Sequence, residues 1–162
     1  ISRGWGTSRT RSQRRCWNAN QDLTVRICRP RLTSAKLALY RRYLDIRHDR
    51  DAGDGPEDFL YNSPVESREI EFWMNDQLVC VAIIDLIPSG LSAVYTYFDP
   101  DHAARGLGTF AVLWEINYCR ERDWPYCYLG YYVRDCRKMN YKNRYLPHEV
   151  LGPDGTWHRG AP

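Results

Sequence analysis

The pattern of apolar and polar positions is clearest between residues 91 and 133, where it predicts a strand, a helix and a second strand. Residues 91–99 are rich in β-branched and aromatic side chains, which favour strands. Apolar residues then recur at helical spacing until Trp124-Pro125, and residues 126–133 form a nearly continuous apolar run. Such a run is typical of a buried parallel strand, so the three elements predict a right-handed βαβ unit. The helical positions are Leu107, Phe110, Ala111, Trp114 and Tyr118.

Two turn signals upstream predict an antiparallel meander of three strands that leads into this unit. Residues 68–74 and 77–87 flank Asn75-Asp76, a pair that suits a hairpin turn. Pro88-Ser89-Gly90 supplies a second tight turn before residue 91. Asp85 lies inside an apolar run, and two interpretations stay open for it: a position on an exposed sheet edge, or a buried carboxylate with a partner.

The N-terminal part of the chain predicts two helices around one strand. Residues 10–20 suit a short helix, residues 22–29 alternate as in a half-buried strand, and residues 33–48 show helical spacing. The longer helix has a cap at Thr33-Ser34 and ends at Arg47-His48, where positive charge complements the helix dipole. A further short helix is expected within residues 56–61.

The two ends of the chain carry weaker signals. Residues 1–9 show neither a cap nor a strand pattern and begin without Met, so we expect a remnant of an upstream domain there. Residues 134–145 are basic and aromatic, and residues 146–162 contain Pro147, Gly152-Pro153 and Gly155, which predicts an extended tail. The expected organisation is a remnant at 1–9, one catalytic-type domain at 10–151 and a tail at 152–162.

This order of elements resembles that of GNAT-type acyltransferases, an α/β (α+β) fold with a mixed sheet, an antiparallel meander and a central βαβ unit. In that architecture the strands on either side of the central helix splay apart, and the donor ester or thioester binds in the opening. The helix begins at Leu107-Gly108-Thr109, whose backbone N–H groups suit a phosphate or an oxyanion, or are simply an ordinary helix start. The coenzyme A loop of the fold is only partly matched, because Gly106 and Gly108 fit but Ala103 stands where Gln or Arg is usual.

Composition places the chain among single-domain proteins and indicates an anionic partner. The chain has 162 residues and a net charge of only +3, yet residues 1–50 hold 13 Lys and Arg against 3 acids. This basic stretch is interleaved with Trp5, Trp17 and Tyr40, which favours nucleic acid over an ordinary solvated face.

Cysteine usage and hydropathy point to a cytoplasmic protein. The six cysteines are far apart and form no CxxC pair, so we expect reduced thiols and neither a metal site nor a disulfide framework. No run of 18 apolar residues is present, and the basic start has no apolar stretch, so the sequence predicts no membrane segment and no signal peptide.

Several ordered blocks carry a resemblance to a known family: SRTRSQRR, LALYRRYLDIRHD, PEDFL, LSAVYTYFDPD, LGTFAVLWEI, YLGYYVRDCRKMNYK and PHEVL. Over roughly residues 9–151 the chain resembles the C-terminal domain of aminoacyl-tRNA–protein transferases. It is most similar to the bacterial aspartate/glutamate leucyltransferase branch, and less so to eukaryotic arginyltransferases. The resemblance implies transfer of an amino acid from aminoacyl-tRNA, with no other cofactor, to the N-terminal Asp or Glu of a protein, which marks it for degradation. The family carries an N-terminal domain with a cysteine cluster. This sequence contains no block that resembles that domain, as expected of a fragment or a shortened homologue.

The catalytic candidates lie near the expected cleft. Tyr97 lies on the first splayed strand, where a hydroxyl suits a reacting group, although most tyrosines on such strands are core residues. Asp99 follows that strand, at the usual place for a functional side chain, and a plain Asp99-Pro100 turn is the alternative. His48 is a candidate base, and cation–dipole capping is its alternative role.

The substrate-binding candidates are arginines, cleft tyrosines and the start of the central helix. The arginines suit the acceptor carboxylate or tRNA phosphates, and the tyrosines suit stacking on adenine. Surface charge is the alternative for the basic residues, and we favour it for Lys138. The full set is Arg11, Arg14, Arg15, Arg47, Tyr95, Leu107, Gly108, Thr109, Tyr128, Tyr131, Tyr141 and Lys142.

Three functions are consistent with the sequence. The first is the aminoacyl-tRNA-dependent transferase, the second an acetyl-coenzyme A-dependent N-acetyltransferase, and the third a non-catalytic RNA-binding remnant. For the first, leucine is favoured as donor mainly because the resemblance is closest to the leucine-transferring bacterial branch. The aromatic and aliphatic cleft strands agree with leucine, while Asp99 and Asp85 keep arginine open.

Overall fold

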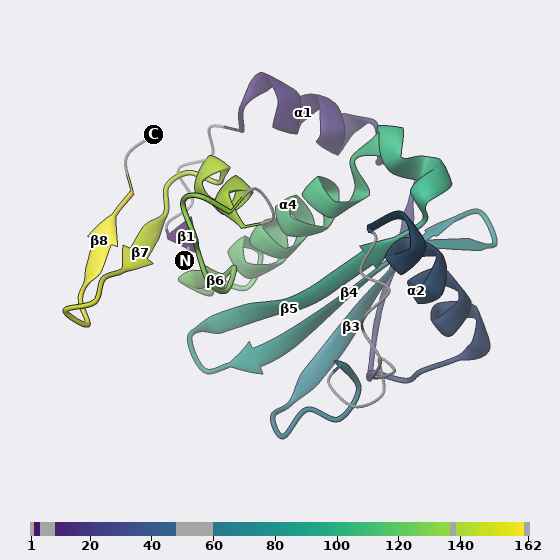
Figure 1. Cartoon of the computed structure of the whole chain (residues 1–162), viewed down its shortest axis with the longest axis horizontal. Helices are drawn as coiled ribbons and strands as arrows, with labels where there is room; N and C mark the ends of the chain where they lie inside the picture. The colour runs from purple at the N-terminus through teal and green to yellow at the C-terminus, as the bar shows by residue number, and fades with distance from the viewer. Residues whose placement is uncertain (1, 4–8, 48–59, 137–138, 161–162) are drawn as a thin grey trace.

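A six-stranded mixed sheet forms the centre of the protein (Figure 1). The computed structural model describes residues 2–3, 9–47, 60–136 and 139–160. In sheet order the strands are β1 (Ser2–Arg3), β6 (Tyr126–Tyr128), β5 (Gly90–Phe98), β4 (Gln77–Ile87), β3 (Ser67–Met74) and β2 (Thr24–Cys28). The helices are α1 (Arg11–Asn18), α2 (Ser34–Arg47) and α4 (Leu107–Arg120), with 3-10 helices η1 (Pro100–Arg105) and η2 (Asn140–Arg144).

The predicted meander is confirmed, since β3, β4 and β5 pair antiparallel in sequence order. Asn75 takes a left-handed conformation (φ 53°) in the β3–β4 turn, which Asn tolerates better than most residues. Asp85 lies on β4, inside the sheet, and accepts hydrogen bonds from the hydroxyls of Ser67 (2.5 Å) and Ser63 (3.3 Å). It is therefore a partnered carboxylate and not an edge position.

The predicted βαβ unit is confirmed, with one correction. β5 and β6 are parallel and pair only over Gly90–Tyr126, Leu91–Cys127 and Ser92–Tyr128. The strand expected over residues 126–133 ends at Tyr128, so that expectation is wrong in its second half. The two strands diverge beyond this point, and Gly130 adopts φ 76°, which ends the extended conformation.

The two faces of the sheet are covered by different helices. Along β4, Cys80, Ala82 and Ile84 pack in the core on the α4 side, whereas Val81 and Ile83 pack with residues of α2. Figure 1 shows α1 lying over α4, which adds a further layer on that side. The period-two alternation expected of a strand thus divides the core into two clusters.

Both chain ends differ from the expectation. The tail is not extended, because β7 (Glu149–Leu151) and β8 (Trp157–Arg159) pair as an antiparallel hairpin. β1 pairs with β6, so the expectation that residues 1–9 contain no strand is wrong. The domain limits at 1–9, 10–151 and 152–162 stay a prediction. Most of the helix expected within 56–61 lies outside the described residues, and so does His48.

Two further features concern the cysteines and the possibility of a membrane-spanning helix. All six cysteines are free thiols. Within the part of the chain that the structure describes, no helix combines the length and apolar composition that crossing a membrane requires.

Candidate functional site

The divergence of β5 and β6 opens a cleft of about 540 Å³, here called the β5 cleft. Its floor is β5 from Ala93 to Phe98, and α4, the segment after β6 and η2 supply the walls. The register between β4 and β5 shifts at Ile83/Ile84, which leaves Val94 as an extra residue in β5. Such a bulge bends its strand and leaves backbone groups unpaired, and here it lies where β5 leaves β6.

The start of α4 faces this cleft. Gly106 precedes the helix with φ 65°, a conformation that suits glycine, and no side chain caps the helix start. A Cβ at Gly108 would lie 3.2 Å from the Phe98 ring, so the helix packs closely against β5. Gly106, Gly108 and Thr109 all line the cleft. The first backbone N–H groups of a helix have no partner within it, and they attract negative charge.

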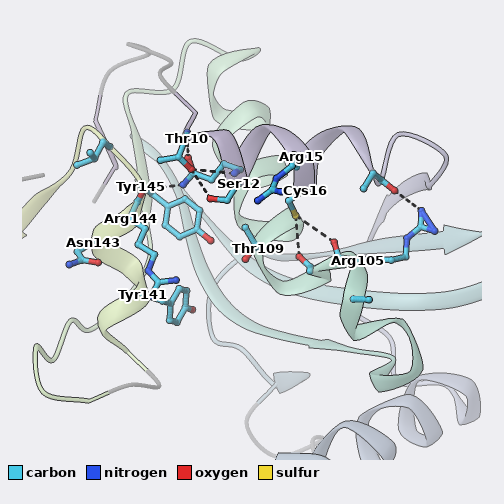
Figure 2. Close-up of a pocket in the computed structure, with 15 residues that line it drawn as sticks. Thr10, Ser12, Arg15, Cys16, Arg105, Thr109, Tyr141, Asn143, Arg144 and Tyr145 are labelled. Atoms are coloured by element: carbon cyan, nitrogen blue, oxygen red, sulfur yellow. Dashed lines mark hydrogen bonds between the residues drawn. The ribbon is translucent and has the colours of Figure 1, made fainter.

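A second cavity of about 810 Å³, here called the arginine cavity, lies on the other side of the α4 start. Figure 2 shows that its side chains come from α1, from the start of α4 and from η2. Gly106, Thr109 and Tyr141 line both cavities, so the two adjoin at that point. Among the described residues that line the arginine cavity, three are arginines and none is acidic. They are Arg15, Arg105 and Arg144.

The loop before α4 is held by α1. Asn20 is 1% exposed and donates to the carbonyls of Cys16 (2.8 Å) and Arg105 (2.9 Å). Arg105 in turn bonds to Asn20, to the Ala19 carbonyl and to Asp22. Its guanidinium is therefore committed to the fold. Among the described residues, no carboxylate pairs with Arg15 or Arg144, which leaves these two able to bind an anion.

Gln13 fixes the opposite wall of the arginine cavity. Thr10 and Gln13 form a capping box that starts α1, with bonds of 3.2 and 2.9 Å. The Gln13 amide then donates to the Arg144 carbonyl at 2.9 Å, which ties η2 to α1. Tyr145 is buried beside Arg144 and hydrogen-bonds Thr109; burial raises the pKa of its phenol, more than that bond lowers it.

A third cavity, here called the hairpin cavity, has a volume of about 630 Å³ and lies between the segment after β6 and the β7–β8 hairpin. Leu129 and Lys142 line both this cavity and the β5 cleft. The Lys142 ammonium donates to the Tyr131 carbonyl at 2.7 Å. Burial lowers the pKa of Lys142.

Most of the predicted binding residues line one of these three cavities. The β5 cleft brings together Tyr95, Gly108, Thr109, Tyr141 and Lys142. Arg15 lines the arginine cavity, and Tyr128 and Tyr131 line the hairpin cavity. Their roles as ligands of a substrate stay predictions.

The other predicted residues lie elsewhere. Tyr97 is fully buried and its hydroxyl bonds to that of Tyr61 at 2.8 Å. Asp99 is 1% exposed and binds both guanidinium nitrogens of Arg42, at 2.8 and 3.1 Å. Leu107 is fully buried in the core under α4.

The predicted arginines of α1 differ in whether they line a cavity. Arg11 and Arg14 are solvent-exposed and do not line the described cavities, and Arg14 donates to the Arg9 carbonyl at 2.7 Å. Arg47 ends α2, and its side chain lies outside the described part. Of the arginines predicted on α1, only Arg15 therefore reaches a cavity.

Sequence reasoning missed several residues that the structure singles out. Arg144 and Tyr145 lie in the basic, aromatic stretch 134–145, so composition already marked their region. Glu115 is fully buried, and neither of its oxygens has a hydrogen-bond partner among the described residues. Its position on the stripe with Leu107, Ala111 and Cys119 was a visible signal, since residues four apart share a helix face.

One group of side chains has the composition of a metal site. Donor atoms of Cys28, Glu69 and Glu71 lie within 4.8 Å of one another. The Lys36 ammonium binds both carboxylates, that of Glu71 at 2.7 Å. Because this ammonium already lies between the two carboxylates, we assign no metal to the group.

Comparisons with known proteins agree with this geometry. A family profile described as "Arginine-tRNA-protein transferase, C terminus" matches residues 35–152. The chain is 45% identical over 155 residues to an aspartate/glutamate leucyltransferase of Hahella chejuensis, covering 93% of this chain and 66% of the relative. It is 48% identical over 160 residues to one of Stenotrophomonas maltophilia, covering 91% and 63%. The chain thus spans less than two thirds of the length of these relatives.

Solved structures support the fold. The ribosomal-protein-S18-alanine N-acetyltransferase of Escherichia coli superposes with a TM-score of 0.56 at 15% identity, covering 83% of this chain and 88% of that one. L-PGS of Bacillus licheniformis gives a TM-score of 0.58 at 14% identity over 79% of this chain and 41% of that one. A structure described as an acetyltransferase of Brucella melitensis gives 0.50. The likeness confirms the predicted GNAT fold.

Proposed function

The chain belongs to the arginine-tRNA-protein transferase family through its C-terminal domain, and on that basis we propose that it is an aminoacyltransferase that moves leucine from charged tRNA to the N-terminal Asp or Glu of a protein. The proposal includes a cytoplasmic setting, where the added residue marks the protein for degradation. Three features of the described cavities support it, and each concerns one part of the two substrates.

The reaction needs positioning more than covalent help. The acceptor's α-amine nitrogen bonds to the carbonyl carbon of the aminoacyl ester, and the bond from that carbon to the ribose oxygen breaks. The amine loses one proton, and the ribose oxygen gains one. Because an α-amine has a pKa of about 7.7–8.0, a modest base or water suffices. Backbone N–H groups at the start of α4 and at the Val94 bulge suit the oxyanion that forms.

The composition of the β5 cleft supports leucine over arginine. Among its described lining residues the only charged side chain is Lys142, which would repel a guanidinium. The two carboxylates that kept arginine open are both occupied, Asp99 by Arg42 and Asp85 by serine hydroxyls. The lining includes Phe98, Val112 and Leu129, and burying a leucyl side chain against such a surface contributes about 2 kcal/mol.

The arginine cavity suits the phosphates of the tRNA 3′ end. It meets the β5 cleft at Thr109 and Tyr141, so a nucleotide there lies next to an aminoacyl group in the cleft. Arg15 and Arg144 approach it from different elements, α1 and η2 (Figure 2). Guanidinium groups bind phosphate oxygens with two parallel hydrogen bonds. Of the two roles open to Arg15, the acceptor carboxylate and a tRNA phosphate, this position favours the phosphate.

The observation that carries the proposal is a cleft whose described lining has no acidic residue and which adjoins a cavity with two arginines that no described carboxylate pairs, on a fold of acyl transfer. The test supplies leucyl-tRNA, arginyl-tRNA and acetyl-coenzyme A in separate reactions with peptides that begin with Glu, Asp, Gln or Asn. We expect leucine transfer at least about tenfold faster than arginine transfer, as a charge mismatch of 1.4 kcal/mol already gives. Peptides beginning with Glu or Asp are expected to react preferentially.

Each other outcome overturns a stated part of the proposal. Faster arginine transfer overturns the donor, and equal transfer to all four peptides overturns the acceptor. Transfer from acetyl-coenzyme A alone makes the chain an N-acetyltransferase. Absence of transfer from every donor, with charged tRNA still bound, makes it an RNA-binding protein.

A further inference from the structure

The hairpin cavity has no part in the donor chemistry above. One of its walls is the segment from Tyr128 to Tyr132, and the other is the β7–β8 hairpin with Val150, Leu151 and Trp157. The rings of Tyr128 and Trp157 meet edge to face, with centroids 6.1 Å apart. Aromatic and aliphatic side chains therefore dominate the lining, as is usual for a cavity that takes up an apolar group.

The hairpin cavity adjoins the β5 cleft. Leu129 and Lys142 line both, and the bond from Lys142 to the Tyr131 carbonyl holds η2 against the segment after β6. An amine must meet the ester carbonyl in the cleft for transfer to occur, so the two substrates have to arrive from different directions. A ligand in the hairpin cavity reaches the ester by passing these two side chains.

The two cavities that flank the cleft differ in charge. Three guanidinium groups line the arginine cavity; that of Arg105 pairs with Asp22, whereas Arg15 and Arg144 pair with no described carboxylate. The hairpin cavity has Lys142 and Glu149, whose charges cancel, and His148, whose pKa is lowered by burial. A tRNA end carries one phosphate per nucleotide, whereas the main chain of a polypeptide carries no charge. Charge complementarity therefore favours nucleotides in the arginine cavity and a polypeptide in the hairpin cavity.

The backbone beside the hairpin cavity suits an extended peptide. β6 ends at Tyr128, and residues 129–133 have no strand partner within the described part of the chain. Tyr131 is 86% exposed and Val133 46%. The carbonyls of Tyr131 and Val133 already accept hydrogen bonds from Lys142 and from the Cys136 N–H. The other backbone groups of the segment can pair with a bound peptide, and such main-chain pairing is a common mode of peptide recognition.

We propose that the hairpin cavity is the acceptor site, which binds the residues that follow the N-terminal Asp or Glu of the polypeptide in an extended conformation. The α-amine then points past Lys142 into the β5 cleft, and an apolar or aromatic side chain at the second or third position fills the cavity. This inference rests on the proposed function, because it presumes a polypeptide acceptor.

The first test varies the peptide and leaves the protein unchanged. Wild-type chain is assayed with leucyl-tRNA and two peptides that begin Glu-Leu-Phe or Glu-Gly-Gly and share the remaining sequence. We expect KM for the first peptide to be about tenfold lower, as burial of apolar side chains implies. Equal KM values overturn the acceptor site while leaving the proposed function intact. Absence of any transfer overturns the proposed function itself.

The second test separates the two cavities by mutation. Trp157→Ala is expected to raise KM for the Glu-Leu-Phe peptide about tenfold and to leave KM for leucyl-tRNA within about twofold. Arg144→Ala should do the reverse. Val65→Ala is the control, since Val65 is 50% exposed and lines none of the three cavities. A rise in the tRNA KM alone for Trp157→Ala shows that the cavity takes a nucleotide and overturns the inference, as does no change in either KM.

Discussion

The two faces of the sheet treat buried carboxylates in opposite ways. On the α2 face, Asp99 is bound by Arg42, and Glu69 and Glu71 are bound by Lys36. On the α4 face, Glu115 is fully buried, and no described residue bonds to its oxygens. Burying an ionised carboxylate without a partner is energetically unfavourable. On the α2 face, cationic side chains pair with the carboxylates, whereas on the α4 face the carboxyl group stays protonated.

The titration of these groups follows from that difference. Burial alone would lower the pKa of Lys36, but its bonds to Glu69 and Glu71 outweigh burial and raise it. Burial likewise tends to raise the pKa of Glu71, and the bonds from Lys36 and Trp73 lower it instead. For Glu115, burial raises the pKa to about 8, so the carboxyl is protonated at pH 7.

The two faces therefore respond to pH in opposite directions. Glu71 has a lowered pKa in the folded protein, so it contributes stability above its unfolded pKa and loses that contribution as pH falls. Glu115 has a raised pKa, so the unfolded chain releases this proton first. Its share of the stability falls as pH rises from 4.5 to about 8.

The largest expected effect comes from removing a cation of the α2 face. Lys36→Met leaves Glu69 and Glu71 buried without a countercharge and is expected to lower the free energy of unfolding by about 3–5 kcal/mol at pH 7. Urea unfolding measures it. The triple variant with Glu69→Gln and Glu71→Gln should regain much of the loss.

The matched control is the ion pair of Arg68 with Glu66 on the same strand region, whose carboxylate is 63% exposed. Arg68→Ala is expected to cost less than about 1 kcal/mol. If Lys36→Met costs as little as this control, the cations of the α2 face do not stabilise the buried carboxylates, and the contrast between the faces fails.

The next effect concerns the proton on the α4 face. In the wild type, Glu115 is expected to lower the free energy of unfolding by about 1.4 kcal/mol per pH unit between pH 4.5 and 8. Glu115→Gln carries no titratable proton, so this component should disappear. Urea unfolding at half-unit steps from pH 5 to 8.5 measures the slope.

Glu121→Gln is the control for that slope, because Glu121 is exposed at the end of the same helix. Its profile should follow the wild type. A Glu115→Gln profile that also follows the wild type would mean that Glu115 is ionised in the folded protein and has a partner.

The contrast between the faces was only partly visible in the sequence. Local patterns were sufficient for α4, for the Asn75-Asp76 hairpin and for the parallel pairing of β5 with β6. Each of these depends on spacing or turn chemistry within a few residues. Glu115 was also detectable, since it interrupts an apolar stripe with helical spacing.

Other features depend on contacts that no local pattern encodes. Arg42 lies 57 residues from Asp99, and nothing in either segment indicates their ion pair. The end of β6 at Tyr128 depends on where β5 diverges, although Gly130 was a local sign of it. Gly155 was read as part of an extended tail, whereas its left-handed conformation (φ 76°) helps turn β7 into β8. Each cavity is lined by elements that are far apart in the chain. The sequence therefore identified their arginines and tyrosines as candidates but could not assign them to one site.

The smallest expected effect tests whether Tyr97 belongs to the α2 face as a structural residue or to the cleft as a catalytic one. Tyr97→Phe removes the 2.8 Å bond to Tyr61, and we expect a loss of about 1 kcal/mol in the free energy of unfolding. Burial raises the pKa of the Tyr97 phenol, so it is a poor proton donor or acceptor near pH 7. The kcat of the Tyr97→Phe variant for transfer should therefore stay within about twofold of the wild-type value. Tyr95 lies two residues earlier on the same strand and lines the cleft, so Tyr95→Ala is the matched variant in which transfer should fall. A Tyr97→Phe protein that keeps its stability but loses kcat by more than about tenfold would identify Tyr97 as catalytic.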